Sequence, residues 1–489
     1  MTISNRNTSK APRLGRNLGS LAKDTAIYGL SSIIGRFLNY LLVPLYTAKM
    51  TAASGGYGII THMYAITALL LVLLTFGMET TFFRFANKEG EDAGKVFSTA
   101  LIGTGALSSL FFVAVLAFLP SLSSVLGYAD NPQFVWVMAL IVAIDAFRAI
   151  PFAYLRQQKK ALKFASLQLL NIGVNIALNC LYYLVLDGHD PGYAFYINLV
   201  CSVLITLCLY REIAHIRHGF DKKLLHRMLS YSWPIVVLGI AGILNQVADK
   251  IMFPYIYNGA DAKMQLGIYG ACAKIAMIMA MITQAFRYAY EPFVFGKTRD
   301  KDNDTMQAAA MKYFIIFTLL AFLCVVGWID LLKHIISPDY WEGLNVVPIV
   351  MAAEIMMGIY FNLSFWYKLE DKTIWGAVFS GIGCAVLISI NIIFVPRYSY
   401  TACAWAGFAG YAVAMLLSYF VGQKYHPIKY PMGDIALYLL LSVLIFAAMT
   451  MLRSSSATWL SLSVNTLLIG LFAGLVVWKD FYLKHRKTC

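Results

Sequence analysis

Eight ionisable side chains lie inside long apolar segments of this sequence. In hydrocarbon each such residue costs about 2.5–3.5 kcal/mol on insertion scales, so its presence needs a structural or functional reason. Cations outnumber carboxylates in the set, and a cavity with excess positive charge suits an anionic substrate such as a diphosphate. We expect them to face a wet cavity, although Arg287 is close enough to a helix end to snorkel. The eight are Arg36, Asp145, Arg148, Asp249, Lys250, Lys274, Arg287 and Glu354.

Two pairs of neighbouring charges differ in their helical geometry. Asp145 and Arg148 are three residues apart, so they share a helix face and could pair. Asp249 and Lys250 are adjacent and point about 100° apart, so they are not expected to satisfy each other along one face. Lys274 is the natural partner for Asp249 on the next helix. Structural ion pairs that hold the fold together are the alternative to a functional role in both cases.

Glu354 has no cation within four residues on its own helix. A carboxylate of this kind is either protonated or part of a path for a coupling ion or proton. We therefore predict two sets of site residues: substrate-binding cations Arg36, Arg148, Lys250 and Lys274, and ion-coupling candidates Glu354, Asp145 and Asp249.

Transmembrane helices must position these charges. The chain is 60% hydrophobic and 13% charged over 489 residues, and a run of about 20 apolar residues spans a bilayer as a helix. This composition predicts an all-α polytopic membrane protein with about fourteen spans. They are placed at roughly 24–47, 57–79, 96–119, 134–155, 164–186, 192–212, 231–256, 265–290, 312–332, 343–367, 373–395, 400–422, 434–452 and 457–479.

Lys and Arg concentrate in every second gap between these spans, beginning with the N-terminal tail and ending with the C-terminal tail. Cytoplasmic loops carry such an excess, so both termini are expected in the cytoplasm. An enzyme active site would have to lie within the bilayer or at its edge, because all loops are short. The other gaps contain only Lys49, Lys263, Lys333, Arg397 and Arg453.

The chain divides into two similar halves. Asp145 in helix 4 and Glu354 in helix 10 are 209 residues apart, and Pro44 matches Pro254. Six helices per half make a parallel repeat about an axis along the membrane normal, with a central cavity between the halves. The expected parts are a basic tail (1–23), an N-lobe (24–212), a cytoplasmic linker (213–229), a C-lobe (230–422), and an appended helix pair with a cytoplasmic tail (423–489).

Several function classes are disfavoured. The net charge of +14 resides in short loops, where it sets topology and contacts anionic lipid, so no nucleic-acid partner is expected. There is no GxxxxGK[ST] loop, no catalytic Ser/His/Asp or Cys/His set, and no removable signal peptide. His215 and His218 lack a third metal ligand. We expect no cofactor, no metal site and no catalytic residues.

Several segments together carry a family resemblance: Gly56-Tyr57-Gly58, Thr75-Phe76-Gly77-Met78-Glu79 with Arg84-Phe85, Asn245-Gln246-Val247-Ala248-Asp249-Lys250, Leu266-Gly267-Ile268-Tyr269-Gly270, Tyr290-Glu291-Pro292 and Lys372-Thr373. Along the first twelve helices the chain resembles the polysaccharide (O-antigen type) flippases of the multidrug/oligosaccharidyl-lipid/polysaccharide exporter superfamily. The resemblance implies a V-shaped pair of six-helix lobes around a cationic cavity. It also implies an inner-membrane protein of lipopolysaccharide, O-antigen or capsule synthesis, which flips an undecaprenyl-diphosphate-linked oligosaccharide to the outer leaflet. An H⁺ or Na⁺ gradient would drive the step, and glycan polymerases are potential partners.

Three other functions stay open. A lipid II flippase ranks second, since the arginine-rich first helix associated with that branch is reduced here to Arg36. A multidrug exporter ranks third, because the cavities of that branch carry carboxylates without so many cations. A membrane-embedded glycan polymerase or ligase ranks last, because such enzymes tend to carry a large outside loop. A purely structural scaffold would not retain so many costly buried charges.

The orientation can be tested with reporters that are active only outside the cytoplasm. A fusion after Cys489 should give no signal, and a fusion near Ser121 should give a strong one, because cations mark the cytoplasmic gaps. The reverse pattern would contradict both the topology and the parallel repeat.

Overall fold

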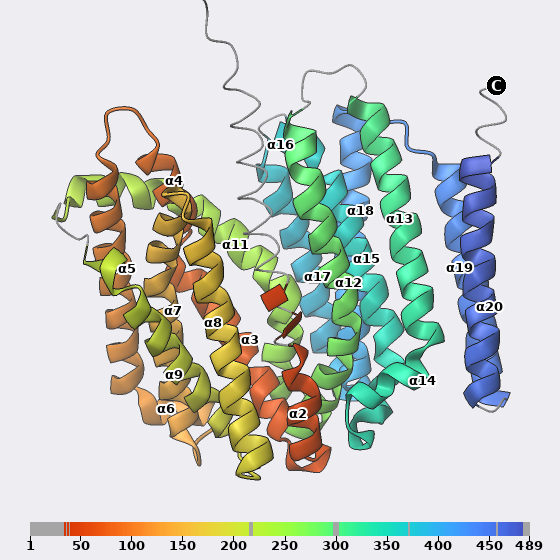
Figure 1. The fold of residues 1–489 in the computed structure, drawn as a ribbon, viewed down its shortest axis with the longest axis horizontal. Coiled ribbons are helices and arrows are strands. Elements are labelled where there is room, and N and C mark those ends of the chain that lie inside the picture. Colours follow the sequence, from red (N-terminus) through yellow and green to blue (C-terminus); the bar gives the residue numbers. More distant parts are fainter. Residues whose placement is uncertain are drawn as a thin grey trace, which may run out of the picture.

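The computed structural model describes residues 34–35, 37–38, 40–214, 219–296, 303–369, 372–455 and 458–482, and their regular elements are all helical (Figure 1). Within these residues, twelve helices are long and apolar enough to cross a membrane, and Gly192–Cys208 is a shorter apolar helix. The all-α membrane class is therefore confirmed. The predicted first span, 24–47, falls largely outside the described residues, so the count of fourteen stays a prediction.

The N-lobe contains the end of this first span, in α2, and the helices that follow it. They are α2 (Leu42–Lys49), α3 (Gly56–Thr75), α4 (Met78–Ala86), α5 (Ala93–Ala117), α6 (Leu119–Val125), α7 (Pro132–Gln157), α8 (Ala161–Cys180), α9 (Gly192–Cys208) and α10 (Tyr210–Ile213). The C-lobe has α11 (Lys222–Ile256), α12 (Ala262–Gly296), α13 (Asn303–Gly327), α14 (Ile329–Leu332), α15 (Val346–Leu363), α16 (Phe365–Leu369), α17 (Ile374–Tyr398) and α18 (Tyr400–Tyr425). The final pair is α19 (Met432–Ser455) and α20 (Thr458–Val477).

The two lobes reproduce the same helix contacts. The N-lobe packs α3 on α7, α5 on α7, α7 on α9 and α8 on α9. In the C-lobe the corresponding pairs are α12 on α15, α13 on α15, α15 on α18 and α17 on α18. Ser202 on α9 donates a hydrogen bond to Asp145 on α7, and Tyr411, 209 residues later, lies on α18, which packs against α15, the helix of Glu354. This correspondence supports the predicted parallel repeat.

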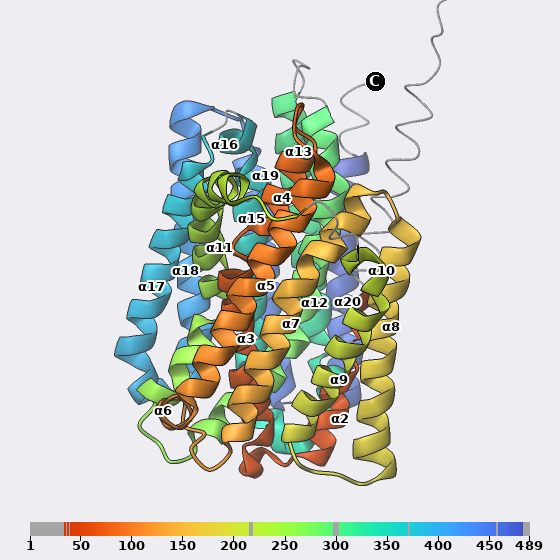
Figure 2. The same ribbon diagram turned by 90° about the vertical axis from the view of Figure 1, so that its left-hand side faces the viewer.

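Helix α11 crosses from one lobe to the other (Figures 1 and 2). Its first part contacts the N-lobe, where the Thr81 and Ser232 hydroxyls are 2.5 Å apart. Its second part packs on α17, where Asn245 Nδ2 donates to the Ser380 carbonyl at 2.9 Å. The helix begins at Lys222 rather than near 231, because the Asp221 carboxylate caps its first amides. Part of the predicted linker is therefore helical and joins the lobes rigidly.

The lobes are in close contact at the end predicted to face outside. A Cβ on Gly58 of α3 would lie 1.8 Å from the Lys263 carbonyl of α12, so the two backbones could not approach this closely with any other residue. Nearby, Tyr340 donates to the Met50 carbonyl at 2.7 Å, and its ring packs edge-on against Tyr57. These contacts close the outer end of the interface between the lobes.

Helices α19 and α20 pack against α13 and against each other (Figure 1). Lys312 of α13, at the first residue of the predicted span 312–332, is buried, with its side chain 3% exposed. Its ammonium lies 2.5 Å from Asp480 and 2.7 Å from Asp434, and Tyr438 donates to Asp480. Lys479 adds a second contact to Asp434 at 2.7 Å. This ion network attaches the appended pair to the C-lobe.

We predict that Lys312→Ala destabilises the protein by about 3–5 kcal/mol, because it removes the buried cation that contacts both Asp480 and Asp434. Lys479→Ala is the matched control: it removes a half-exposed cation while Lys312 keeps both carboxylates, so the cost should be below about 1 kcal/mol. Thermal unfolding of the purified variants measures the difference. Equally small losses would show that this network does not hold the pair.

Candidate functional site

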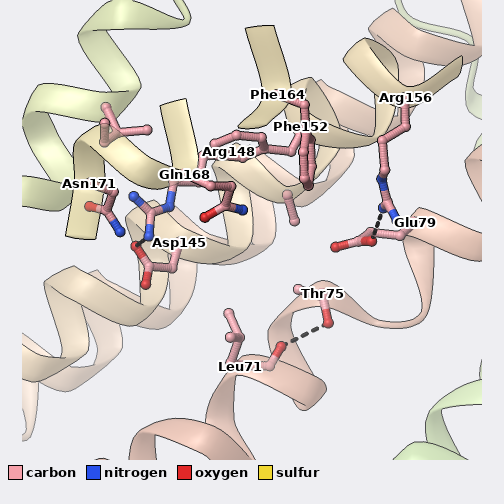
Figure 3. Close-up of a pocket in the computed structure, with 12 residues that line it drawn as sticks. Leu71, Thr75, Glu79, Asp145, Arg148, Phe152, Arg156, Phe164, Gln168 and Asn171 are labelled. Atoms are coloured by element: carbon pink, nitrogen blue, oxygen red, sulfur yellow. Dashed lines mark hydrogen bonds and ion pairs between the residues drawn. The ribbon is translucent and has the colours of Figure 1, made fainter. Parts of the chain in front are cut away.

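A cavity of about 280 Å³ lies within the N-lobe, between α3, α4, α7, α8 and α9 (Figure 3). Its wall combines charged, amide and aromatic side chains, which is a typical composition for a small-molecule site. The lining residues are Leu71, Thr75, Glu79, Asp145, Arg148, Ala149, Phe152, Arg156, Phe164, Gln168, Asn171 and Ile205.

Helix α7 supplies one continuous side of the cavity. Asp145, Arg148, Phe152 and Arg156 are spaced by three, four and four residues, which places them on a single helix face. At 1.5 Å per residue, this stripe extends for about 16 Å along the axis. The cavity therefore runs from the C-terminal end of α7, which is predicted to face the cytoplasm, toward the middle of the helix.

An ion pair forms the deep end of the cavity. Arg148 Nη2 lies 3.0 Å from Asp145 Oδ1, as the spacing predicted, and Ser202 donates to the same carboxylate at 2.8 Å. Two polar atoms near this pair are buried without a hydrogen-bond partner among the described residues: Arg148 Nη1 and Asn171 Oδ1. Figure 3 shows Asn171 beside the Arg148 guanidinium. The deep end thus offers one donor and one acceptor to a ligand.

The mouth of the cavity has a second ion pair, at 2.5 Å between Arg156 and Glu79. Glu79 reaches it because the chain turns sharply between α3 and α4, where Phe76 and Gly77 adopt left-handed backbone angles (φ 48° and 61°). The Arg156 guanidinium also lies over the Phe83 ring, 5.1 Å from its centroid. This pair is more exposed than the deep one, since the Glu79 side chain is 42% exposed and that of Asp145 is 20% exposed.

Between the two ion pairs the wall is aromatic. Phe152 and Phe164 pack edge to face with ring centroids 5.5 Å apart, and Gln168 lies one turn beyond Phe164 on α8 (Figure 3). Aromatic faces and side-chain amides accommodate molecules that alternate apolar faces with hydroxyl groups. The cavity can therefore bind a polar ligand that carries both anionic and neutral hydrogen-bonding parts.

The C-lobe contains the second group of intramembrane charges. Lys250 Nζ lies 2.9 Å from Asp249 Oδ2, and Tyr269 donates to the same oxygen at 2.7 Å. The expectation that these adjacent residues could not satisfy each other was therefore wrong. The flexible lysine stem folds back across the angle between the two side chains and also reaches the Gln246 carbonyl. Lys274 is not needed as the partner of Asp249.

Glu354 and Lys274 are the charges without a counterpart. Glu354 Oε2 is buried with no hydrogen-bond partner, and Lys274 makes no hydrogen bond or ion pair among the described residues. Both side chains are half-buried, and the Lys250 charge acts on each of them. Glu354 is thus the predicted isolated carboxylate, and the Lys250 charge that acts on it comes from another helix.

The described residues divide the predicted site into two groups. Asp145 and Arg148 line the N-lobe cavity, whereas Asp249, Lys250, Lys274 and Glu354 belong to the C-lobe. Arg36 lies outside the described residues. The residue before it, Gly35, contacts Ile172 of α8, which follows Asn171 of the cavity wall. One cationic cavity shared by both groups therefore stays a prediction.

Of the twelve lining residues, sequence reasoning predicted only Asp145 and Arg148 as site residues. Glu79 was considered only as part of a family motif, and Phe164, Gln168 and Asn171 were not considered. Helical periodicity would have placed Phe164, Gln168 and Asn171 on one helix face, because they are spaced by four and three residues. The same period connects Arg156 with Arg148, but no local pattern connects Glu79 with α7.

The fold is similar to the folds of two solved transport proteins. The solved structure of the "Lipid II flippase MurJ, inward closed conformation" is similar, with a TM-score of 0.73 at 15% identity over 92% of this chain and 98% of that one. The solved structure of an inward-facing multidrug resistance MATE family transporter of the MOP superfamily is also similar. Its TM-score is 0.65 at 14% identity, over 79% of this chain and 93% of that one. At these identities the likeness concerns the fold alone.

The sequence itself gives the family. Two Haemophilus influenzae proteins are similar in sequence. "Lsg locus putative protein 1" is 21% identical over 65% of this chain and 77% of its own length. An uncharacterized membrane protein is 20% identical over 78% of this chain and 93% of its own length. A family model described as "Polysaccharide biosynthesis protein" matches residues 21–289, which is more than half of the chain. The chain, a multi-pass membrane protein, therefore belongs to the polysaccharide biosynthesis protein family.

Proposed function

We propose that this protein is a flippase for a lipid-linked glycan. Its substrate would be an undecaprenyl-diphosphate-linked repeat unit, moved from the cytoplasmic to the outer leaflet of a bacterial inner membrane by alternating access. The N-lobe cavity carries this proposal, because it offers ion pairs, aromatic faces and amides in one space inside the membrane. Such a lining suits a glycan and its diphosphate better than an apolar drug. The product would be exported for O-antigen or capsule synthesis, with glycan polymerases as partners.

A lipid II flippase is the second candidate. Its support is the TM-score of 0.73 to the lipid II flippase structure, against 0.65 for the multidrug transporter. Lipid II also carries a diphosphate between an isoprenoid and sugars, so the same cavity chemistry would serve. The two functions differ in the glycan and in its destination, and a comparison of surface glycan with peptidoglycan synthesis in a gene-deletion strain distinguishes them.

Ion coupling is proposed for the C-lobe. Glu354 occupies the position equivalent to Asp145, yet only Asp145 has a cation, Arg148, one turn away. A carboxylate with a buried, unpartnered oxygen can bind H⁺ or Na⁺ when water reaches it and release it after the lobes rock. Asp145 and Asp249 are held by Arg148 and Lys250, so they would serve chiefly to keep those cations in place.

The cationic residues provide the first test. In a deletion strain, the wild-type gene should restore surface glycan, while Arg36→Ala and Lys274→Ala should not, because each removes an intramembrane cation that attracts the anionic substrate. Lys274, in the C-lobe, would act on the substrate from outside the N-lobe cavity. Lys274 makes no ion pair among the described residues, so its loss should leave folding intact. Arg397→Ala, in a predicted outer gap, is the control. Wild-type glycan levels in both test variants, at normal expression, would exclude these residues from the site.

Glu354→Gln provides the second test. Glutamine preserves size and hydrogen bonding but cannot cycle a charge, so substrate binding should persist while gradient-driven flipping in reconstituted vesicles is lost. Asp145→Asn should instead lower the unfolding temperature, because it strands Arg148. A normal gradient-driven rate in Glu354→Gln vesicles would leave this residue a structural role only.

A further inference from the structure

We propose that the N-lobe cavity binds the substrate in a fixed direction, with the diphosphate at Arg156 in the mouth and the first sugar at Arg148 and Asn171 in the deep end. This assignment rests on the proposed flippase function. It adds that the site has two parts, one for the diphosphate and one for the first sugar. A cavity of about 280 Å³ is at the small end for ligand pockets, so it would hold the junction between lipid and glycan rather than a whole repeat unit.

Depth is the first argument. Arg156 lies one residue before the end of α7, and the exposed Lys159 and Lys160 follow it, which places it at the level of lipid phosphates. Arg148 is eight residues earlier, about 12 Å deeper along the helix. A lipid-bound diphosphate in the inner leaflet therefore meets Arg156 first. The sugar attached to it can extend along the aromatic wall toward Arg148.

The second argument concerns the counter-ions of the two arginines. Arg156, at the mouth, can exchange its carboxylate partner Glu79 for a diphosphate, whereas Arg148 cannot exchange Asp145. Glu79 is 42% exposed, so it can leave Arg156 for water at a cost of about 1 kcal/mol or less. A diphosphate then takes its place with a stronger, charge-assisted contact. Asp145 cannot leave in this way, because it is mostly buried and also accepts from Ser202. Arg148 is therefore neutralised before any ligand arrives.

The third argument is the chemistry of the deep end. Arg148 Nη1 has an unused donor and Asn171 Oδ1 an unused acceptor, both buried. A sugar hydroxyl donates and accepts at the same time, so it can satisfy both atoms together. A phosphate oxygen only accepts, and it would leave Asn171 Oδ1 unpaired and lie close to Asp145. The deep end is matched to a neutral hydroxyl group.

The test measures binding of sugar-free undecaprenyl diphosphate to the purified full-length protein in nanodiscs of uncharged lipid. Arg156→Gln should weaken this binding by about tenfold, through loss of a charge-assisted contact. Glu79→Gln should strengthen it by about threefold, because the competing carboxylate is gone. Asn171→Ala should leave it unchanged, because this substitution removes no charge and leaves the Arg148–Asp145 ion pair in place.

The second arm uses the same lipid carrying the repeat unit extracted from the producing strain. The wild-type protein should bind it more tightly than the sugar-free lipid, and Asn171→Ala should lose that gain. If Asn171→Ala weakens the sugar-free lipid as much as Arg156→Gln, or if Glu79→Gln weakens it, the proposed direction is wrong. If the wild-type protein binds neither lipid, the proposed flippase function itself fails.

Discussion

The cost of placing charge in hydrocarbon shapes this structure more than any other constraint. Each ionisable side chain inside the spans must be paired, reach an interface, or serve a function that offsets its cost. Asp145, Asp249 and Lys312 are paired, with oppositely charged partners at 2.5–3.0 Å. Glu354 and Lys274 do not, although both lie within the electrostatic reach of Lys250. Among the described residues, these two unpaired charges are therefore candidates for a functional role.

The internal repeat lets two lobes with one architecture carry different chemistry. Asp145 and Glu354 occupy equivalent positions, and so do their neighbours Ser202 and Tyr411. In the N-lobe an arginine one turn along neutralises the carboxylate and leaves donors for a ligand. In the C-lobe the corresponding carboxylate stays without a partner. On this proposal the N-lobe recognises the substrate and the C-lobe cycles the charge, and α11 joins the two lobes.

The sequence predicted whatever depends on local periodicity and composition. Apolar run lengths gave the membrane class, and the three-residue spacing gave the Asp145–Arg148 pair, because helix geometry alone brings those side chains together. The sequence did not predict contacts that depend on a flexible lysine side chain or on tertiary packing. Lys250 folds back onto Asp249, and Lys312 is buried by two helices more than a hundred residues away. Glu79 reaches Arg156 only because the chain turns at Phe76 and Gly77.

The central claim, that a lipid-linked glycan binds in the N-lobe cavity, is tested most directly by an electron cryo-microscopy structure of the full chain. The protein would be prepared in nanodiscs with the lipid-linked repeat unit from its own strain. The account predicts density between α7 and α8, with the diphosphate beside Arg156 and a sugar beside Arg148. Clear substrate density elsewhere, with this cavity empty, would contradict it.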